Sequence, residues 1–193
     1  MARRALPGIV LLAVILHAVG IARTLLPAQD GLKFLRVARA FQRQPWTDVV
    51  RSSDQHPLYP AAIALTEPVV AALIGPGPDA WRIAAQGVSA FAATLLILPV
   101  FVFTRALFGR PTAAFAALLL VLLPVPAAIG RDTLSDSLAL CGFGLTLCWG
   151  ESALRTKRVG PAISCGLAAG FGYWTRPEMA ILPALVAAPG RAP

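Results

Sequence analysis

Ionisable side chains are scarce in this chain, and most of those that could take part in catalysis or binding lie in three short polar clusters between apolar runs. Carboxylates can act as general bases or as ligands of a divalent cation, and arginine and histidine can bind a phosphate group. Charged groups are costly near a membrane and are therefore candidates for function. The candidates are Asp30 and His56 in the first cluster, Arg131, Asp132 and Asp136 in the second, and Arg176 in the third.

The first cluster lies in the longest polar stretch, from Ala28 to Pro60. Asp30 either caps the helix that follows it or presents a carboxylate at a membrane surface as a general base or metal ligand, and the two interpretations are compatible. After Asp30, two kinds of side chain separate onto opposite faces of a helix, which predicts an amphipathic helix in the plane of the head groups. The apolar face holds Leu32, Phe34, Leu35, Val37, Ala38 and Phe41, and the other face holds Lys33, Arg36, Arg39 and Arg43.

The other two clusters lie where apolar segments are interrupted. In the second, Arg131 is suited to hold a phosphate and the two carboxylates to hold a cation, although Asp132 is also placed to cap the next helix. In the third, a proline break follows Arg176. Its charges either form a mutual pair between Arg176 and Glu178 or line a polar site where the break frees backbone groups.

The composition predicts a membrane protein. Hydrophobic residues make up 57% of the 193 residues, charged residues 13%, and the mean hydropathy is +0.71. We expect an all-α, polytopic transmembrane bundle of five to seven membrane segments in a single transmembrane domain, residues 1–193, because lipid cannot satisfy free backbone groups. The expected first span is 5–26, the outer loop with its interfacial helix is 27–56, and the further segments are 57–75, 81–104, 112–130, 134–154 and 160–188.

The net charge of +8 comes from basic residues scattered at the ends of segments. This pattern favours anionic membrane lipid as a partner and excludes nucleic acid. The cysteines Cys141, Cys148 and Cys165 lie within apolar segments without the spacing of a metal site, and we interpret them as small buried hydrophobic residues.

The charge pattern also predicts orientation. Arg3 and Arg4 before the first apolar run place the N-terminus in the cytoplasm, if that run is an uncleaved span instead of a signal peptide. Basic residues at 105–110 and 155–158 should then be cytoplasmic as well, which requires an odd number of crossings between His56 and Arg105. Two apolar segments lie between them. Either Pro57–Gly75 dips into the bilayer without crossing it, or Arg105 and Arg110 break the rule.

Several short patterns together resemble a known family. An early acidic residue in a polar loop is followed by H-P-x-Y-P at 56–60, R-x-L-F-G-R at 105–110, R-D-x-L-S-D at 131–136 and T-R-P-E at 175–178. This arrangement, from about Met1 to Pro183, resembles the GT-C superfamily of membrane glycosyltransferases. Its members include protein O-mannosyltransferases, the lipid A aminoarabinose transferase and the catalytic subunit of oligosaccharyltransferase.

The resemblance implies an activity and roles for the candidates. Such enzymes transfer a sugar from a polyprenyl-phosphate donor to an acceptor on the outer face, here expected to be that of a bacterial plasma membrane. Asp30 would activate the acceptor. Asp136, with Asp132, would bind a divalent cation such as Mg²⁺ or Mn²⁺, and Arg131, His56 and Arg176 would bind the donor phosphate.

The sequence also departs from the family pattern. Gly31 follows Asp30 where many members have a second acidic residue, and members commonly have further spans and an extra domain. We therefore expect the front part of a longer enzyme, or a chain whose missing helices come from a partner. The alternatives are a truncated inactive remnant, a non-catalytic membrane subunit, or a small transporter-like bundle, although the last predicts an inverted repeat that is not visible.

Overall fold

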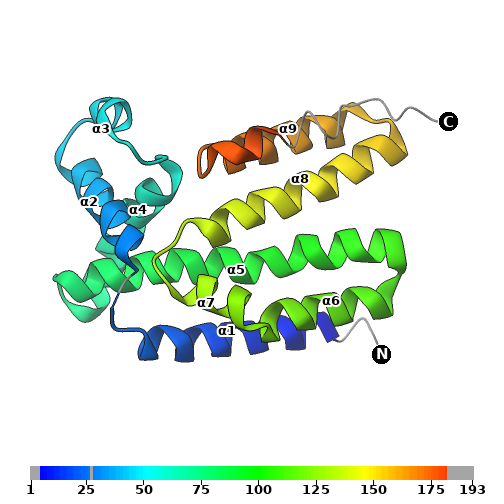
Figure 1. Cartoon of the computed structure of the whole chain (residues 1–193), viewed down its shortest axis with the longest axis horizontal. Helices are drawn as coiled ribbons and strands as arrows, with labels where there is room; N and C mark the ends of the chain where they lie inside the picture. The colour runs from blue at the N-terminus through cyan, green and yellow to red at the C-terminus, as the bar shows by residue number, and fades with distance from the viewer. Residues whose placement is uncertain (1–4, 27, 182–193) are drawn as a thin grey trace.

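The computed structural model describes residues 5–26 and 28–181, and within these ranges the chain is entirely helical, as the sequence predicts (Figure 1). The element order is α1 (Ala5–Arg23), α2 (Gln29–Arg43), α3 (Trp46–Ser52), α4 (Leu58–Ile74), α5 (Pro78–Phe108), α6 (Arg110–Leu122), α7 (Pro124–Arg131), α8 (Asp136–Thr156), α9 (Val159–Tyr173) and a short 3-10 helix (Pro177–Ala180).

Three helices, α1, α5 and α8, are long and apolar enough to cross a membrane. The bent pair α6 and α7 would make a fourth span if the two are counted together. The described residues thus hold fewer candidate spans than the five to seven expected from hydropathy. Segment 57–75 forms α4, whose 17 residues reach only about 25 Å. Segment 160–188 forms α9, which ends at Tyr173, and its last residues lie outside the described ranges.

Glycine and proline set the boundaries between the long helices. Gly109, at the junction of α5 and α6, has a φ of 84°, a conformation that residues with a side chain rarely adopt. Leu123 is extended, as a residue before proline prefers, and Pro124 then begins α7. The resulting bend between α6 and α7 is 60°.

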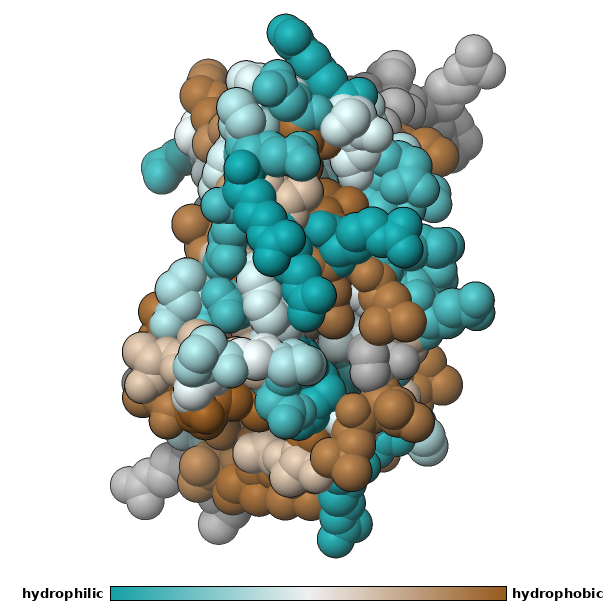
Figure 2. Space-filling view, turned by 90° about the vertical axis from the view of Figure 1, so that its left-hand side faces the viewer, coloured by the Kyte–Doolittle hydropathy of each residue, from teal (hydrophilic) through white to brown (hydrophobic). Residues whose placement is uncertain are grey.

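The bundle has two chemically different ends (Figure 1). One, here named the polar end, carries α2, α3, residues 53–57, the turn 132–135 and residues 174–178. Figure 2 looks onto it and shows hydrophilic side chains gathered above a more hydrophobic rim. The opposite end, here named the basic end, carries the turns with Arg105, Arg110, Arg155, Lys157 and Arg158.

Helix α4 lies beside the beginning of α5, at the polar end (Figure 1). Its buried residues Tyr59 and Ile63 belong to one core with Ala84 and Ala85 of α5. Only α5 therefore runs the length of the bundle between His56 and Arg105. This arrangement favours the interpretation in which segment 57–75 does not cross, and that interpretation stays a prediction.

The amphipathic helix predicted after Asp30 is present as α2. Its apolar residues Phe34, Leu35, Ala38 and Phe41 are buried in the core shared with α4 and α5, whereas Leu32 is exposed. The apolar face thus packs mainly on protein, and the row Lys33, Arg36, Arg39 and Arg43 stays exposed. The Arg39 guanidinium lies 5.3 Å from the centre of the Trp81 ring, a favourable cation–π contact with α5.

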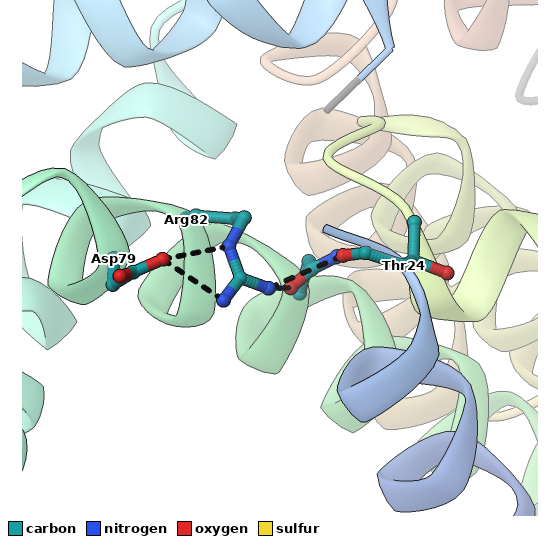
Figure 3. Close-up of polar contacts among 4 residues, drawn as sticks. Thr24, Asp79 and Arg82 are labelled. Carbon is teal, nitrogen blue, oxygen red and sulfur yellow. Dashed lines mark hydrogen bonds and ion pairs between the residues drawn. The ribbon is translucent and has the colours of Figure 1, made fainter. Parts of the chain in front are cut away.

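Hydrogen bonds and an ion pair connect the end of α1 to the beginning of α5 (Figure 3). The Thr24 carbonyl accepts hydrogen bonds from Arg82 Nη1 at 3.2 Å and Gln86 Nε2 at 2.9 Å. Arg82 also pairs with Asp79 at 3.0 Å. A cation and an amide donor satisfy a free carbonyl at a helix C-terminus, which fixes where the chain leaves α1 toward the first loop.

Candidate functional site

A hollow of about 330 Å³ opens at the polar end. It lies between α2, the loop before α4, the turn that leads into α8, and the non-helical residues that follow α9. Asp30, His56 and Arg176 line it, together with Gln55, Ser135 and Glu178. The structure therefore brings together three of the six predicted site residues from three separate parts of the sequence.

Asp30 lies in the first turn of α2 and does not cap it. Ala28 is the N-cap residue, and its side chain makes no capping hydrogen bond. The capping interpretation of Asp30 is therefore wrong: its Oδ1 instead lies 2.9 Å from Lys33 Nζ, one turn along the exposed side of the helix. This hydrogen bond, and then the charge of Asp30, raise the pKa of Lys33 above its usual value. The carboxylate remains exposed at the rim of the hollow.

His56 is placed by a short turn and by the end of α9. The Ser53 hydroxyl accepts a hydrogen bond from Gln55 N at 3.0 Å, which shapes the loop just before the histidine. The imidazole meets the Tyr173 ring edge-on, with ring centres 6.2 Å apart. Leu58 N donates to the Trp174 carbonyl at 3.2 Å, so the beginning of α4 is tied to the chain just after α9.

Arg176 is held at the break after α9. Its backbone is extended before Pro177, and its N–H donates to Gly172 O at 2.8 Å. Close packing of α9 on α8 fixes this end, because a Cβ on Gly142 would lie 2.9 Å from Gly172 Cα. The Arg176 Nη2 lies 2.8 Å from Asp136 Oδ1 in the first turn of α8. The mutual pair of Arg176 with Glu178 is therefore wrong, and the partner of Arg176 is Asp136.

Asp132 and Arg131 lie outside the lining of the hollow. Asp132 Oδ1 accepts hydrogen bonds from Ala28 N at 3.0 Å and Thr133 N at 2.7 Å. It does not cap α8, whose N-cap residue is Ser135, so the capping interpretation of Asp132 is wrong too. The Arg131 side chain packs over Gly20 of α1, where a Cβ would lie 3.0 Å from Arg131 Cβ.

The carboxylates of the second cluster do not fit a divalent cation. Within residues 5–26 and 28–181, no group of three or more His, Cys, Asp or Glu side chains is placed to hold a metal ion. Asp136 faces an arginine, and Asp132 faces backbone N–H groups. Divalent cations such as Mg²⁺ and Ca²⁺ need several oxygen ligands directed to one point. The carboxylate oxygens of this cluster instead contact backbone N–H groups and an arginine.

Sequence reasoning missed Gln55 and Ser135 as lining residues, whereas Glu178 was one of the charges that it expected either to pair or to line a polar site. The pattern R-D-x-L-S-D contributes Leu134 and Ser135 to the lining, and all four residues of the pattern T-R-P-E line the hollow. Gly31 also lies so close to Thr133 that an added Cβ would be 1.7 Å from Thr133 Oγ1, and no pattern in the sequence predicted this contact.

Comparison with known proteins identifies the family of this chain. Residues 56–189 match the family model of dolichyl-phosphate-mannose-protein mannosyltransferases. The match begins at His56 and includes Asp136 and Arg176, whereas Asp30 precedes it. The searches of curated proteins and of solved structures returned no match. Because the matched region covers more than half of the chain, this protein belongs to the dolichyl-phosphate-mannose-protein mannosyltransferase family of membrane glycosyltransferases.

Proposed function

We propose that this protein transfers a sugar from a polyprenyl-phosphate donor to an acceptor at the polar end of the bundle. The observation that carries the proposal is the hollow lined by Asp30, His56 and Arg176. A carboxylate and two groups that bind phosphate are what such a reaction needs on opposite sides of the sugar. The family's description names a dolichyl-phosphate-linked mannose donor, which supports a lipid-linked donor of this kind.

In the proposed reaction, an acceptor oxygen or nitrogen forms a bond to the anomeric carbon of the sugar. The bond between that carbon and the phosphate oxygen breaks, and polyprenyl phosphate leaves with the electron pair. Asp30 accepts the proton of the acceptor as a general base. The exposed position of this carboxylate on α2 allows an acceptor to approach from outside the bundle.

Negative charge develops on the departing phosphate, and positive groups fixed nearby stabilise it. Arg176 is suited to this role because its side chain is 41% exposed and its guanidinium, which carries five N–H donors, contacts Asp136 through Nη2. The other guanidinium nitrogens can contact phosphate oxygens. His56 can donate from a ring nitrogen while Tyr173 holds the ring in place.

The membrane setting supports a donor whose tail stays in lipid. The exposed row Arg36, Arg39 and Arg43 on α2 would face the phosphate groups of lipid head groups. The basic end carries Arg105, Arg110, Arg155, Lys157 and Arg158. By the positive-inside rule, these charges place the basic end in the cytoplasm. The polar end would then face the outer side of a plasma membrane.

The test uses the full chain in proteoliposomes with radiolabelled dolichyl-phosphate mannose. The readouts are donor binding, release of dolichyl phosphate, and label in the membrane-protein fraction. Asp30→Asn should lower transfer by about 100-fold or more and leave donor binding intact, because only the base is lost. Asp48→Asn, an exposed carboxylate on α3, is the matched control and should change neither. Full transfer by Asp30→Asn would overturn the role of Asp30, and absence of donor binding by the unaltered protein would overturn the function.

A further inference from the structure

The carboxylate of Asp132 joins two loops that are far apart in the sequence. Its Oδ1 accepts hydrogen bonds from Ala28 N, 104 residues earlier, at 3.0 Å and from Thr133 N at 2.7 Å. Ala28 is the N-cap residue of α2, and its own side chain cannot cap. Asp132 therefore supplies, from another loop, an acceptor oxygen for a backbone N–H at the N-terminus of α2.

A second contact at the same place leaves no room for a side chain on Gly31. The first turn of α2 lies so close to the turn 132–135 that a Cβ on Gly31 would meet Thr133 Oγ1 at 1.7 Å and Thr133 O at 2.9 Å. Thr133 is fully buried beneath the first turn of α2. Gly31 is the neighbour of Asp30, so the contact sets the position of the candidate base directly.

The turn 132–135 also leads straight into the other half of the hollow. Four residues after Asp132, Asp136 begins α8 and pairs with Arg176 at 2.8 Å. A single short segment thus holds α2, with Asp30, on one side and Arg176 on the other. The separation between the candidate base and the candidate phosphate-binding group depends on this segment.

We propose that Asp132 is a positioning residue that holds α2 against the turn 132–135, and that it does not act as a metal ligand. This inference rests on the proposed function for its effect on transfer, although the contact itself does not. Hydrogen bonds from two backbone N–H groups require an acceptor oxygen, which an asparagine side chain also provides. Metal ligation would instead require the carboxylate charge. Asp132→Asn and Asp132→Ala therefore separate the two roles.

The first readout is independent of activity: hydrogen exchange of the amides at residues 28–33 in the full chain reconstituted in nanodiscs. Asp132→Ala should accelerate this exchange by about tenfold or more, because an acceptor for a native hydrogen bond is removed and local opening becomes easier. Asp132→Asn should stay close to the unaltered protein. Asp48→Ala, on exposed α3, is the control and should leave the exchange at residues 28–33 unchanged.

The second readout is transfer from dolichyl-phosphate mannose, measured as a function of Mg²⁺ and Mn²⁺ concentration. Asp132→Ala should lower kcat with little change in the donor KM, and added cation should not restore it. Asp132→Asn should retain transfer with an unchanged cation response. An Asp132→Asn protein that loses transfer and regains it at high cation concentration would overturn the proposal in favour of a metal ligand. Unchanged exchange in Asp132→Ala would overturn it as well. If the unaltered protein shows no transfer, the proposed function fails, and the exchange result still decides whether Asp132 holds α2.

Discussion

The guanidinium of Arg176 lies 2.8 Å from the carboxylate of Asp136 and joins the break after α9 to the first turn of α8. Both side chains are partly exposed, Arg176 at 41% and Asp136 at 28%. A pair in this setting contributes little to stability, under about 1 kcal/mol, because water screens it. Its more important effect is to orient the guanidinium at the wall of the hollow.

Arg176→Gln should therefore weaken donor binding far more than it weakens the fold. We expect the affinity for dolichyl phosphate to fall by about tenfold or more, since a charged contact to phosphate is lost. The melting temperature should move little. Binding is measured by fluorescence titration of nanodisc-embedded protein, and unfolding by a thermal assay in detergent.

The matched control for Arg176 is Arg155→Gln. It breaks another arginine–carboxylate pair, with Glu151 at 3.1 Å, at the basic end of the bundle. Donor affinity should be unchanged in this variant. Equal losses of affinity in both variants would show that the charge of the chain, and not the position of Arg176, determines binding.

Gly31→Ala tests how tightly α2 is held against the turn 132–135. The added Cβ would overlap Thr133 Oγ1 at 1.7 Å and crowd the Thr133 carbonyl at 2.9 Å, and a rotation of the hydroxyl relieves only the first of these contacts. Overpacking of this kind costs about 1–3 kcal/mol. We expect a lower unfolding temperature and lower transfer, because Asp30 is displaced with the turn.

Gly87→Ala in α5 is the control for this substitution. It too replaces a helical glycine, but apart from its chain neighbours and its own helix backbone, no atom of the described residues lies within 4 Å of the added Cβ. Helix propensity alone should then stabilise it by up to about 1 kcal/mol. A Gly31→Ala protein as stable and active as Gly87→Ala would contradict the close contact.

These contacts show what the sequence could and could not predict. The period of apolar residues identified α2, and Pro177 identified the break at residue 176, because both signals are local in the chain. One of the two interpretations of the third cluster paired Arg176 with Glu178, two residues away, although the partner is Asp136, forty residues earlier and on another helix. Similarly, Asp132 binds a backbone N–H at Ala28, and a backbone donor leaves no mark in the sequence. Local periodicity therefore predicted the elements, whereas the packing between helices decided which charges meet.

The pairing of Lys33 with Asp30 predicts a specific pH dependence. Asp30 raises the pKa of Lys33, first by accepting its hydrogen bond and then by its charge. Because the pKa is higher in the folded protein, the contribution of the pair is fully present below the usual lysine pKa. It is lost as the pH rises through the raised value. Activity near neutral pH should therefore not change through titration of Lys33.

Asp30→Asn should lower the pKa of Lys33 back toward its usual value. The measurement is the rate of acetylation of each lysine against pH, followed by mass spectrometry. The chain has two lysines, and Lys157 at the basic end is exposed and serves as the internal reference. In the variant, the profile of Lys33 should move to lower pH, and the profile of Lys157 should be the same in both proteins. A profile for Lys33 that the substitution leaves unchanged would show that the hydrogen bond does not form in solution.

The last prediction concerns α4, whose length decides how many times the chain crosses between His56 and Arg105. At 17 residues it spans about 25 Å, less than the roughly 30 Å of a hydrocarbon core, and it packs beside the beginning of α5. Residues on both sides of α4 should therefore face the same side of the membrane. The experiment places single cysteines at Asp54→Cys, Pro76→Cys and Lys157→Cys in a chain whose three native cysteines are replaced by alanine. A membrane-impermeant maleimide applied outside intact cells should label the cysteines at 54 and 76, and should label the one at 157 only after permeabilisation. If the cysteine at 76 instead behaves like the one at 157, α4 crosses the bilayer, and the basic residues at 105 and 110 cannot lie on the same side as those at 155–158.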